Sequence, residues 1–216
     1  MKNKFLHTFI LLILSFYSYC QQSEGYFQYN IKVTAVDTSL QTQQTVGMLF
    51  DSKMELYYTK TQSRMNFKMG TIYDNSIVIN KTENRGISLS SSPSGKFAVL
   101  LGEKEINTKP KIADSLIIVQ LVNEKKVILG FNCKKAIMRQ GKSEVIYWYT
   151  NEIVVDKTGQ TILNDKIPGF PLYFSMISDG MKMEYQASNY KFQVENKEKV
   201  FSLEIPSDYK LINTGM

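Results

Sequence analysis

Histidine and cysteine are nearly absent from this sequence, and most of the few that it has lie in one short stretch. The 216 residues include one histidine, His7, and two cysteines, Cys20 and Cys133. Residues 1–20 combine a short basic start, an apolar run too short to span a bilayer and an exit of smaller residues. This is the pattern of a secretory signal peptide. We therefore expect residues 1–20 to be removed and residues 21–216 to form one exported domain.

Removal of residues 1–20 would leave a chain without histidine and with a single thiol. A Ser-His-Asp triad cannot form without histidine, and zinc, copper and haem lose their commonest ligands. Cys133 has no second cysteine for an internal disulfide and no histidine to activate it, so we expect a small buried side chain. The sequence therefore predicts no catalytic residues, no metal, no cofactor and no enzyme activity. A hydrolase that uses two carboxylates or a Ser–Lys pair stays open as a further alternative.

Arginine is also scarce, since only Arg64, Arg85 and Arg139 occur among the 26 basic residues. A nucleic-acid-binding protein usually carries more arginine, clustered on one stripe. Here the formal net charge of +6 is scattered and comes mostly from lysine, which is typical of a solvated surface. We expect no nucleic-acid partner.

Long apolar runs are missing after residue 20. No later run approaches the ~18 residues of a membrane-spanning helix, so no transmembrane span is expected in the exported chain. Cys20 offers an alternative, because its lipidation would make the protein a lipoprotein. A lipobox needs a small residue just before the cysteine, and Tyr19 stands there. The predicted location is the periplasm, or the outer membrane as an associated protein.

Alternating apolar and polar residues dominate the rest of the chain. In residues 27–35, Phe27, Tyr29, Ile31 and Val33 alternate with polar side chains, which is the period of a strand with one wet face. The same period recurs in residues 64–69. It also recurs in residues 144–149, where Val145, Tyr147 and Tyr149 share one face opposite Glu144, Ile146 and Trp148.

Turn residues divide the chain at short intervals. Gly141-Lys142 and Asp179-Gly180 predict tight hairpins, and a change of phase near Ser188-Asn189 predicts a turn or a bulge. Residues 123–125 are expected to be a turn between two strands, and residues 38–45 a polar loop or a short helix. No helical pattern of twelve residues occurs. The prediction is a mainly-β chain with one curved antiparallel sheet of about ten strands; a sandwich, a half-barrel and a closed barrel all stay open.

Four segments occur in an order that resembles the GLPGLI and DUF4412 families of exported Bacteroidetes proteins. They read VILGFNCKK at 127–135, IYWYTNEI at 146–153, KIPGFPL at 166–172 and IPSDYK at 205–210. The third segment lacks the first Gly and the second Gly-Leu of the GLPGLI motif, so the choice between the two families stays open. The resemblance implies a fold like that of periplasmic lipoprotein carriers, in which a curved sheet holds an apolar ligand. The families have no settled activity, so no catalytic residues are implied.

The family-motif turn comprises Pro168, Gly169, Phe170 and Pro171. Its two prolines fix two φ angles, and Gly169 permits a conformation that a side chain would forbid, which aims Phe170 into the core. Methionine and aromatic side chains make adaptable apolar surfaces. On that basis the candidate ligand contacts are Trp148, Phe170, Phe174, Met176 and Met183. The alternative is that these side chains fill an ordinary β core.

Two functions follow as hypotheses. In the first, the protein binds an apolar ligand, such as a lipid, or a lipidated partner in the concavity of the sheet, in the envelope of a Gram-negative bacterium. In the second, it is a structural or protein-interaction module of the envelope, with a partner protein docked at a sheet edge.

Overall fold

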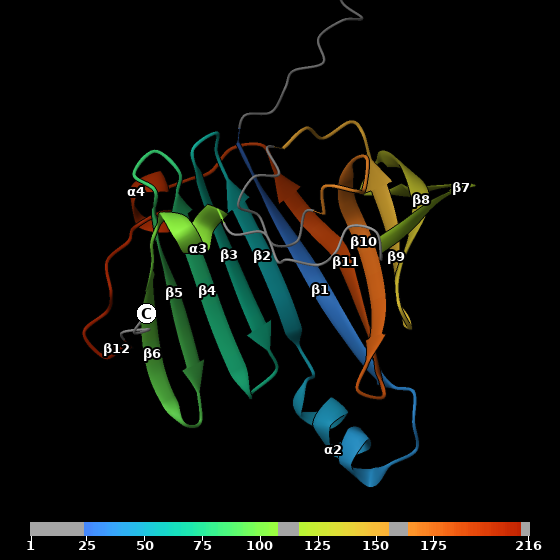
Figure 1. Cartoon of the computed structure of the whole chain (residues 1–216), viewed down its shortest axis with the longest axis horizontal. Coiled ribbons are helices and arrows are strands. Elements are labelled where there is room, and N and C mark those ends of the chain that lie inside the picture. Colours follow the sequence, from blue (N-terminus) through green and yellow to red (C-terminus); the bar gives the residue numbers. More distant parts are fainter. Residues whose placement is uncertain (1–23, 108–116, 156–163, 213–216) are drawn as a thin grey trace, which may run out of the picture.

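The computed structural model describes residues 24–107, 117–155 and 164–212. Within these ranges the chain forms one curved sheet of twelve strands in the order β12-β6-β5-β4-β3-β2-β1-β11-β10-β9-β8-β7 (Figure 1). All pairings are antiparallel except the one between β12 and β6. Strands account for 59% and the sheet is open, which confirms the prediction of a mainly-β chain with a single curved sheet. The predicted signal peptide, with His7 and Cys20, lies outside the described residues.

The elements follow one another with short connections. The strands are β1 (Gly25–Ala35), β2 (Ser52–Tyr58), β3 (Gln62–Met69), β4 (Tyr73–Asn80), β5 (Arg85–Ser92), β6 (Gly95–Leu101), β7 (Ile117–Ile128), β8 (Phe131–Gln140), β9 (Ser143–Thr150), β10 (Phe170–Ser178), β11 (Met181–Lys191) and β12 (Lys210–Leu211). The helices are α2 (Leu40–Met48), α3 (Glu103–Asn107) and α4 (Lys197–Val200).

The strand pattern predicted around residues 27–35 is confirmed in β1, at the middle of the sheet. Phe27, Tyr29 and Ile31 are buried, while the side chains between them are more exposed. β1 pairs with β2 on one side and with β11 on the other. Because side chains alternate across a strand, the buried residues of β1 all face one side of the sheet.

Three of the predicted turns and irregularities are confirmed. Gly141 has a φ of 57° between β8 and β9. Between β10 and β11, Asp179 and Gly180 have φ angles of 50° and 71°, as a two-residue hairpin of type I′ requires. The register of β1 on β11 shifts between Gln28 and Tyr29, which leaves Ser188 as the bulged residue.

One predicted turn is wrong. Residues 123–125 do not separate two strands, because β7 runs through them with a bulge between Val122 and Lys125. The chain instead reverses at Leu129 and Gly130, whose φ angles are 52° and 85°. A bulge accommodates polar residues in a strand at the end of the sheet order, since their side chains stay in water.

Residues 38–45 form a helix rather than a loop. Ser39 is the N-cap of α2, and its hydroxyl accepts a hydrogen bond from the Thr42 backbone N–H at 3.2 Å. Asp37 supports this cap, since its carboxylate accepts from the Ser39 N–H at 3.0 Å and from the Thr42 hydroxyl at 3.1 Å. These bonds satisfy donors that the first helical turn leaves free.

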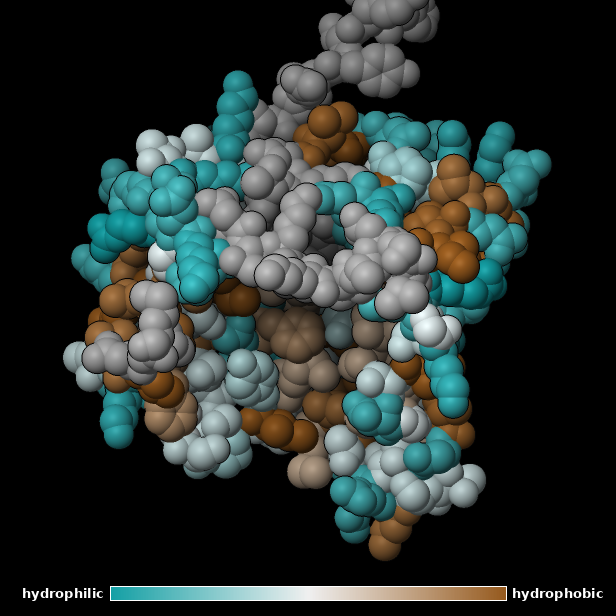
Figure 2. Space-filling view, viewed as in Figure 1, coloured by the Kyte–Doolittle hydropathy of each residue, from teal (hydrophilic) through white to brown (hydrophobic). Residues whose placement is uncertain are grey.

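Two apolar clusters lie on opposite faces of the sheet. The larger cluster occupies the concave face, which is hollowed and lined with apolar side chains in Figure 2. The smaller one lies on the outer face, where Val194 and Phe201 of the C-terminal segment pack against Val78 and Ile87. The concave face is therefore the place to look for an apolar binding site.

Candidate functional site

Aromatic rings from four strands stack on the concave face. We call Phe67, Tyr147, Phe174 and Tyr185 the aromatic stack. The ring centroids of Phe174 and Tyr185 are 4.3 Å apart, and those of Tyr147 and Phe174 are 6.0 Å apart. Phe67 on β3 lies 6.3 Å from Tyr185 on β11, although β1 and β2 separate their strands. Three strand spacings amount to roughly 14 Å in a flat sheet, so this contact requires strong curvature.

Three of the five candidate ligand contacts lie together at this stack. Met176 on β10 and Met183 on β11 are direct cross-strand partners, and Phe174 lies two residues before Met176 on the same face. The Tyr185 hydroxyl is 3.8 Å from the Met183 sulfur. Both methionines are half-buried and pack against the concave-face core. This end of the stack therefore combines rigid rings with side chains that can adapt their shape.

Phe170 is buried in the same core, nearer the opposite end of β10. Its ring centroid lies 4.5 Å from that of Phe27. The neighbouring Pro171 carbonyl accepts a hydrogen bond of 2.7 Å from the Tyr29 hydroxyl, inside the core. This buried bond ties the start of β10 to β1 in the middle of the sheet.

Trp148 is not brought to this site. It pairs with Lys135 on β8 and with Tyr173 on β10, whereas the adjacent Tyr147 pairs with Phe174. Adjacent residues of a strand point to opposite faces, so Trp148 lies on the outer face. Sequence alternation alone placed Trp148 opposite Tyr147, but the relation of both to β10 depends on the strand register.

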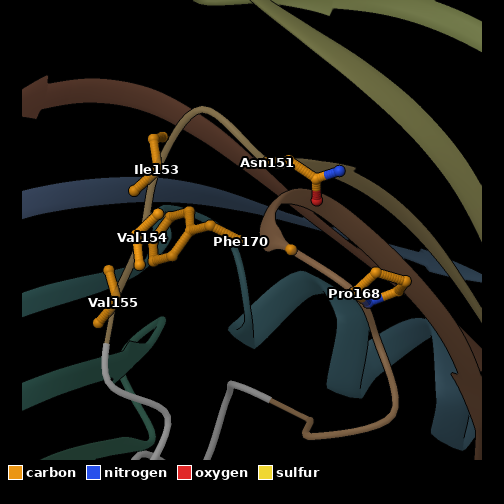
Figure 3. Close-up of a pocket in the computed structure, with 7 residues that line it drawn as sticks. Asn151, Ile153, Val154, Val155, Pro168 and Phe170 are labelled. Carbon is orange, nitrogen blue, oxygen red and sulfur yellow. The ribbon is translucent and has the colours of Figure 1, made fainter. Parts of the chain in front are cut away.

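A cleft of about 230 Å³ opens beside Phe170. Two segments wall it, one following β9 and the other leading into β10 (Figure 3). Its lining residues are Asn151, Ile153, Val154, Val155, Pro168, Gly169 and Phe170. Val154 is exposed, while Ile153 and Phe170 are buried in the core, so the cleft connects solvent with the concave-face cluster.

Gly169 is required by a close approach of two backbone segments. A Cβ atom there would lie 2.3 Å from the Thr150 carbonyl oxygen and 2.6 Å from Asn151 Oδ1. Its φ does not lie in the left-handed region, so the glycine matters for space and not for an unusual conformation. The motif turn thus packs directly against the end of β9 and shapes one wall of the cleft.

The concave-face core holds two buried tyrosine hydroxyls with different fates. Tyr29 donates to Pro171, whereas the Tyr58 hydroxyl has no hydrogen-bond partner within the described ranges. Burial raises the pKa of both phenols well above the usual value, so both stay neutral and keep a proton to donate. A buried hydroxyl without a partner costs about 1–3 kcal/mol.

Chemistry beyond binding finds little support in residues 24–107, 117–155 and 164–212. These residues contain no group of three or more His, Cys, Asp or Glu side chains placed to hold a metal ion. Cys133 is buried, and this burial raises the pKa of its thiol to about 11. In the same residues no helix is long and apolar enough to cross a membrane.

Several residues of the site were not among the sequence candidates. Tyr147 and Tyr185 follow the apolar phase of their strands, so the alternation already marked them as facing the core. Ile153, Val154 and Val155 gave no such signal, because they lie outside any strand. Their role in the cleft follows only from the loop that returns the chain to β10.

The fold and the site define a class of protein: a curved, open antiparallel sheet with an aromatic concave face. No protein-family model matches the sequence, so the assignment to the GLPGLI or DUF4412 family stays a prediction. A search of curated proteins also gives no match.

Several solved structures are similar at low sequence identity. PNGF-II, in the C2 space group, matches 87% of this chain and 30% of its own, with 13% identity and a TM-score of 0.47. This chain therefore spans less than a third of the PNGF-II chain. The Mycobacterium tuberculosis lipoprotein LppX matches 82% of this chain and 96% of its own, with 10% identity and a TM-score of 0.39.

A LolA superfamily protein from Nitrosomonas europaea matches 84% of this chain and 90% of its own, with 10% identity and a TM-score of 0.24. Similarity at these levels does not reveal what this chain binds.

Proposed function

We propose that this protein binds an apolar ligand, either an acyl chain or the lipid group of a lipidated partner, on the concave face of its sheet. The observation that carries the proposal is the continuity between the cleft at Val154 and Phe170 and the apolar core behind it. An apolar chain that enters there exchanges water for aromatic and aliphatic contacts. The proposal includes export to the envelope of a Gram-negative bacterium.

The dimensions of the cleft favour a narrow ligand. Its volume of about 230 Å³ is below the roughly 300–1,000 Å³ of pockets for drug-sized molecules. A single acyl chain, or one end of it, suits this space. Deeper entry would require rearrangement near Phe174, Met176 and Met183, where the two methionines can change conformation at low cost. No covalent step is involved.

A titration with a fluorescent fatty acid tests this proposal. Delipidated protein comprising residues 21–216 should show saturable binding. Val154→Asp places a charge in the cleft at a side chain that is 52% exposed, so it should weaken binding without disturbing the core. Val36→Asp is the matched control, because Val36 is 55% exposed and lies outside the cleft. Unsaturable binding, or equal loss in both variants, would contradict the proposal.

A second function is favoured by the free edge of β7. This strand ends the sheet order and pairs only with β8 among the strands of the described ranges. It exposes Ile118, Leu121 and Val127, each at least 60% accessible. An apolar strand with an unpaired edge is a template for adding a strand from another protein. Crosslinking that recovers one stoichiometric partner at β7, from protein free of lipid, would support an interaction module instead.

A further inference from the structure

The outer face of the sheet carries an apolar patch on its second half, from β7 to β10. In one row across the strands, Val122 pairs with Lys135, Lys135 with Trp148, and Trp148 with Tyr173. In the next row Ile137 pairs with Ile146. Cross-strand partners share a face, so these side chains lie together. We define the outer patch as Ile118, Val122, Ile137, Ile146, Trp148, Tyr173 and Ile177.

The two halves of the outer face differ in their cover. Over β4 and β5, Val78 and Ile87 are buried beneath Val194 and Phe201 of the C-terminal segment. In the outer patch, by contrast, Ile118 is 64% exposed and Ile177 57% exposed, and the other members are only half-buried. Exposed apolar side chains gathered on one surface commonly mark an interaction site.

Basic side chains border the patch and contact its aromatic rings. Lys126 Nζ lies 5.8 Å from the Trp148 ring centroid and 5.5 Å from that of Tyr173. Lys135 Nζ lies 5.9 Å from the Trp148 ring on its other side. These distances suit cation–π contacts.

The acidic residues on this surface do not cancel its positive charge. Glu124 pairs with Lys135 at 2.9 Å, Glu144 with Arg139 at 2.8 Å and Glu184 with Lys182 at 2.9 Å. The exposed Lys126 has no ion-pair partner in the part of the chain that the structure describes, and neither has Lys32, beside Glu184 on β1. The patch is therefore apolar at its centre with an excess of cations.

We propose that the outer patch docks on a lipid surface that contains anionic lipids. Trp and Tyr side chains favour the boundary between headgroups and acyl chains, where their rings are apolar and their polar atoms stay wet. Lysines beside them are attracted to anionic headgroups. A second copy of this chain suits the patch less well, because it would bring Lys126 of both copies together. This inference goes beyond the concave-face ligand and does not depend on it.

The chain carries its own reporter for this interaction, since Trp148 is its only tryptophan. Residues 21–216 should co-sediment with vesicles of phosphatidylcholine and phosphatidylglycerol, with a blue shift of the Trp148 emission. Vesicles of phosphatidylcholine alone should give neither signal. High salt should weaken binding to the anionic vesicles, because it screens the lysines. No fatty acid is added, so failure here and failure of the ligand proposal are distinguishable.

A charge-reversal pair makes the test specific for the patch. Lys126→Glu should weaken binding to anionic vesicles by at least about fivefold. Lys60→Glu, an exposed lysine between β2 and β3, changes the net charge equally and should bind like the wild type. Equal loss in both variants, or equal binding to both vesicle types, would overturn the proposal. A blue shift that tracks protein concentration without vesicles would also overturn it, since it would indicate self-association.

Discussion

Phe174 and Tyr185 stack face to face across β10 and β11, with ring centroids 4.3 Å apart and ring planes 10° apart. They are direct cross-strand partners, and both rings are more than nine-tenths buried. Tyr147 extends the stack on β9 and Phe67 reaches it from β3. The pair therefore joins strands that are distant in the sheet, and much of the concave-face packing depends on it.

Truncation of this stack should destabilise the fold. Phe174→Ala is expected to lower the free energy of unfolding by about 3–5 kcal/mol, because it removes a buried ring and leaves a cavity. Ile177→Ala, three residues along the same strand at a largely exposed position, should change it by less than ~0.5 kcal/mol. Urea unfolding followed by circular dichroism measures both. Similar values for the two variants would mean that the stack contributes little.

Two glycines should respond oppositely to alanine. Gly169→Ala is expected to cost more than ~1 kcal/mol, because the new methyl group would meet the Thr150 carbonyl at 2.3 Å. Gly47→Ala in α2 should instead stabilise by about 0.5–1 kcal/mol, since open space surrounds that position and alanine favours a helix. Thermal unfolding of both variants distinguishes the cases. A neutral Gly169→Ala would contradict the tight approach of the two segments.

The thiol of Cys133 should be inert in the native protein. Burial raises its pKa to about 11, so very little thiolate exists at pH 8 and reagent has no access. With residues 21–216, a coloured thiol reagent should react slowly in buffer and stoichiometrically at once in denaturant. Rapid reaction of the folded protein would instead indicate an accessible or activated thiol.

Glu184 should make stability depend on acid. The Tyr173 hydroxyl donates to its carboxylate at 2.7 Å and Lys182 pairs with it at 2.9 Å, and both lower its pKa, the tyrosine bond most. Because the folded pKa is depressed, the stabilisation is present above the unfolded pKa and is lost as pH falls through the folded one.

Wild-type protein should therefore lose more stability between about pH 5 and pH 3 than Glu184→Gln does. Urea unfolding at a series of pH values measures this difference. Glu204→Gln, at an exposed position, removes the same charge and should follow the wild-type curve. Parallel curves for wild type and Glu184→Gln would refute the assignment.

Local features of this fold were predictable from the sequence. The alternation in residues 27–35 and the hairpin at Asp179-Gly180 depend on neighbouring residues only, through the period of a strand and the positive φ angles of a tight turn. The bulge at Ser188 also left a local trace as a change of phase. The turn expected at residues 123–125 failed because polar residues occur in a bulged strand at the end of the sheet as readily as in a turn.

The sequence by itself thus determined a chain of short strands with alternating faces and little chemistry beyond burial. Tertiary structure decided which faces meet. Trp148 was grouped with Phe174 by residue type, yet the register of β9 on β10 puts Trp148 opposite Tyr173 and on the outer face. The contact of Phe67 with Tyr185, and the cleft beside Phe170, depend on curvature and on a returning loop. Register and curvature arise from pairing between distant segments, which no local pattern encodes.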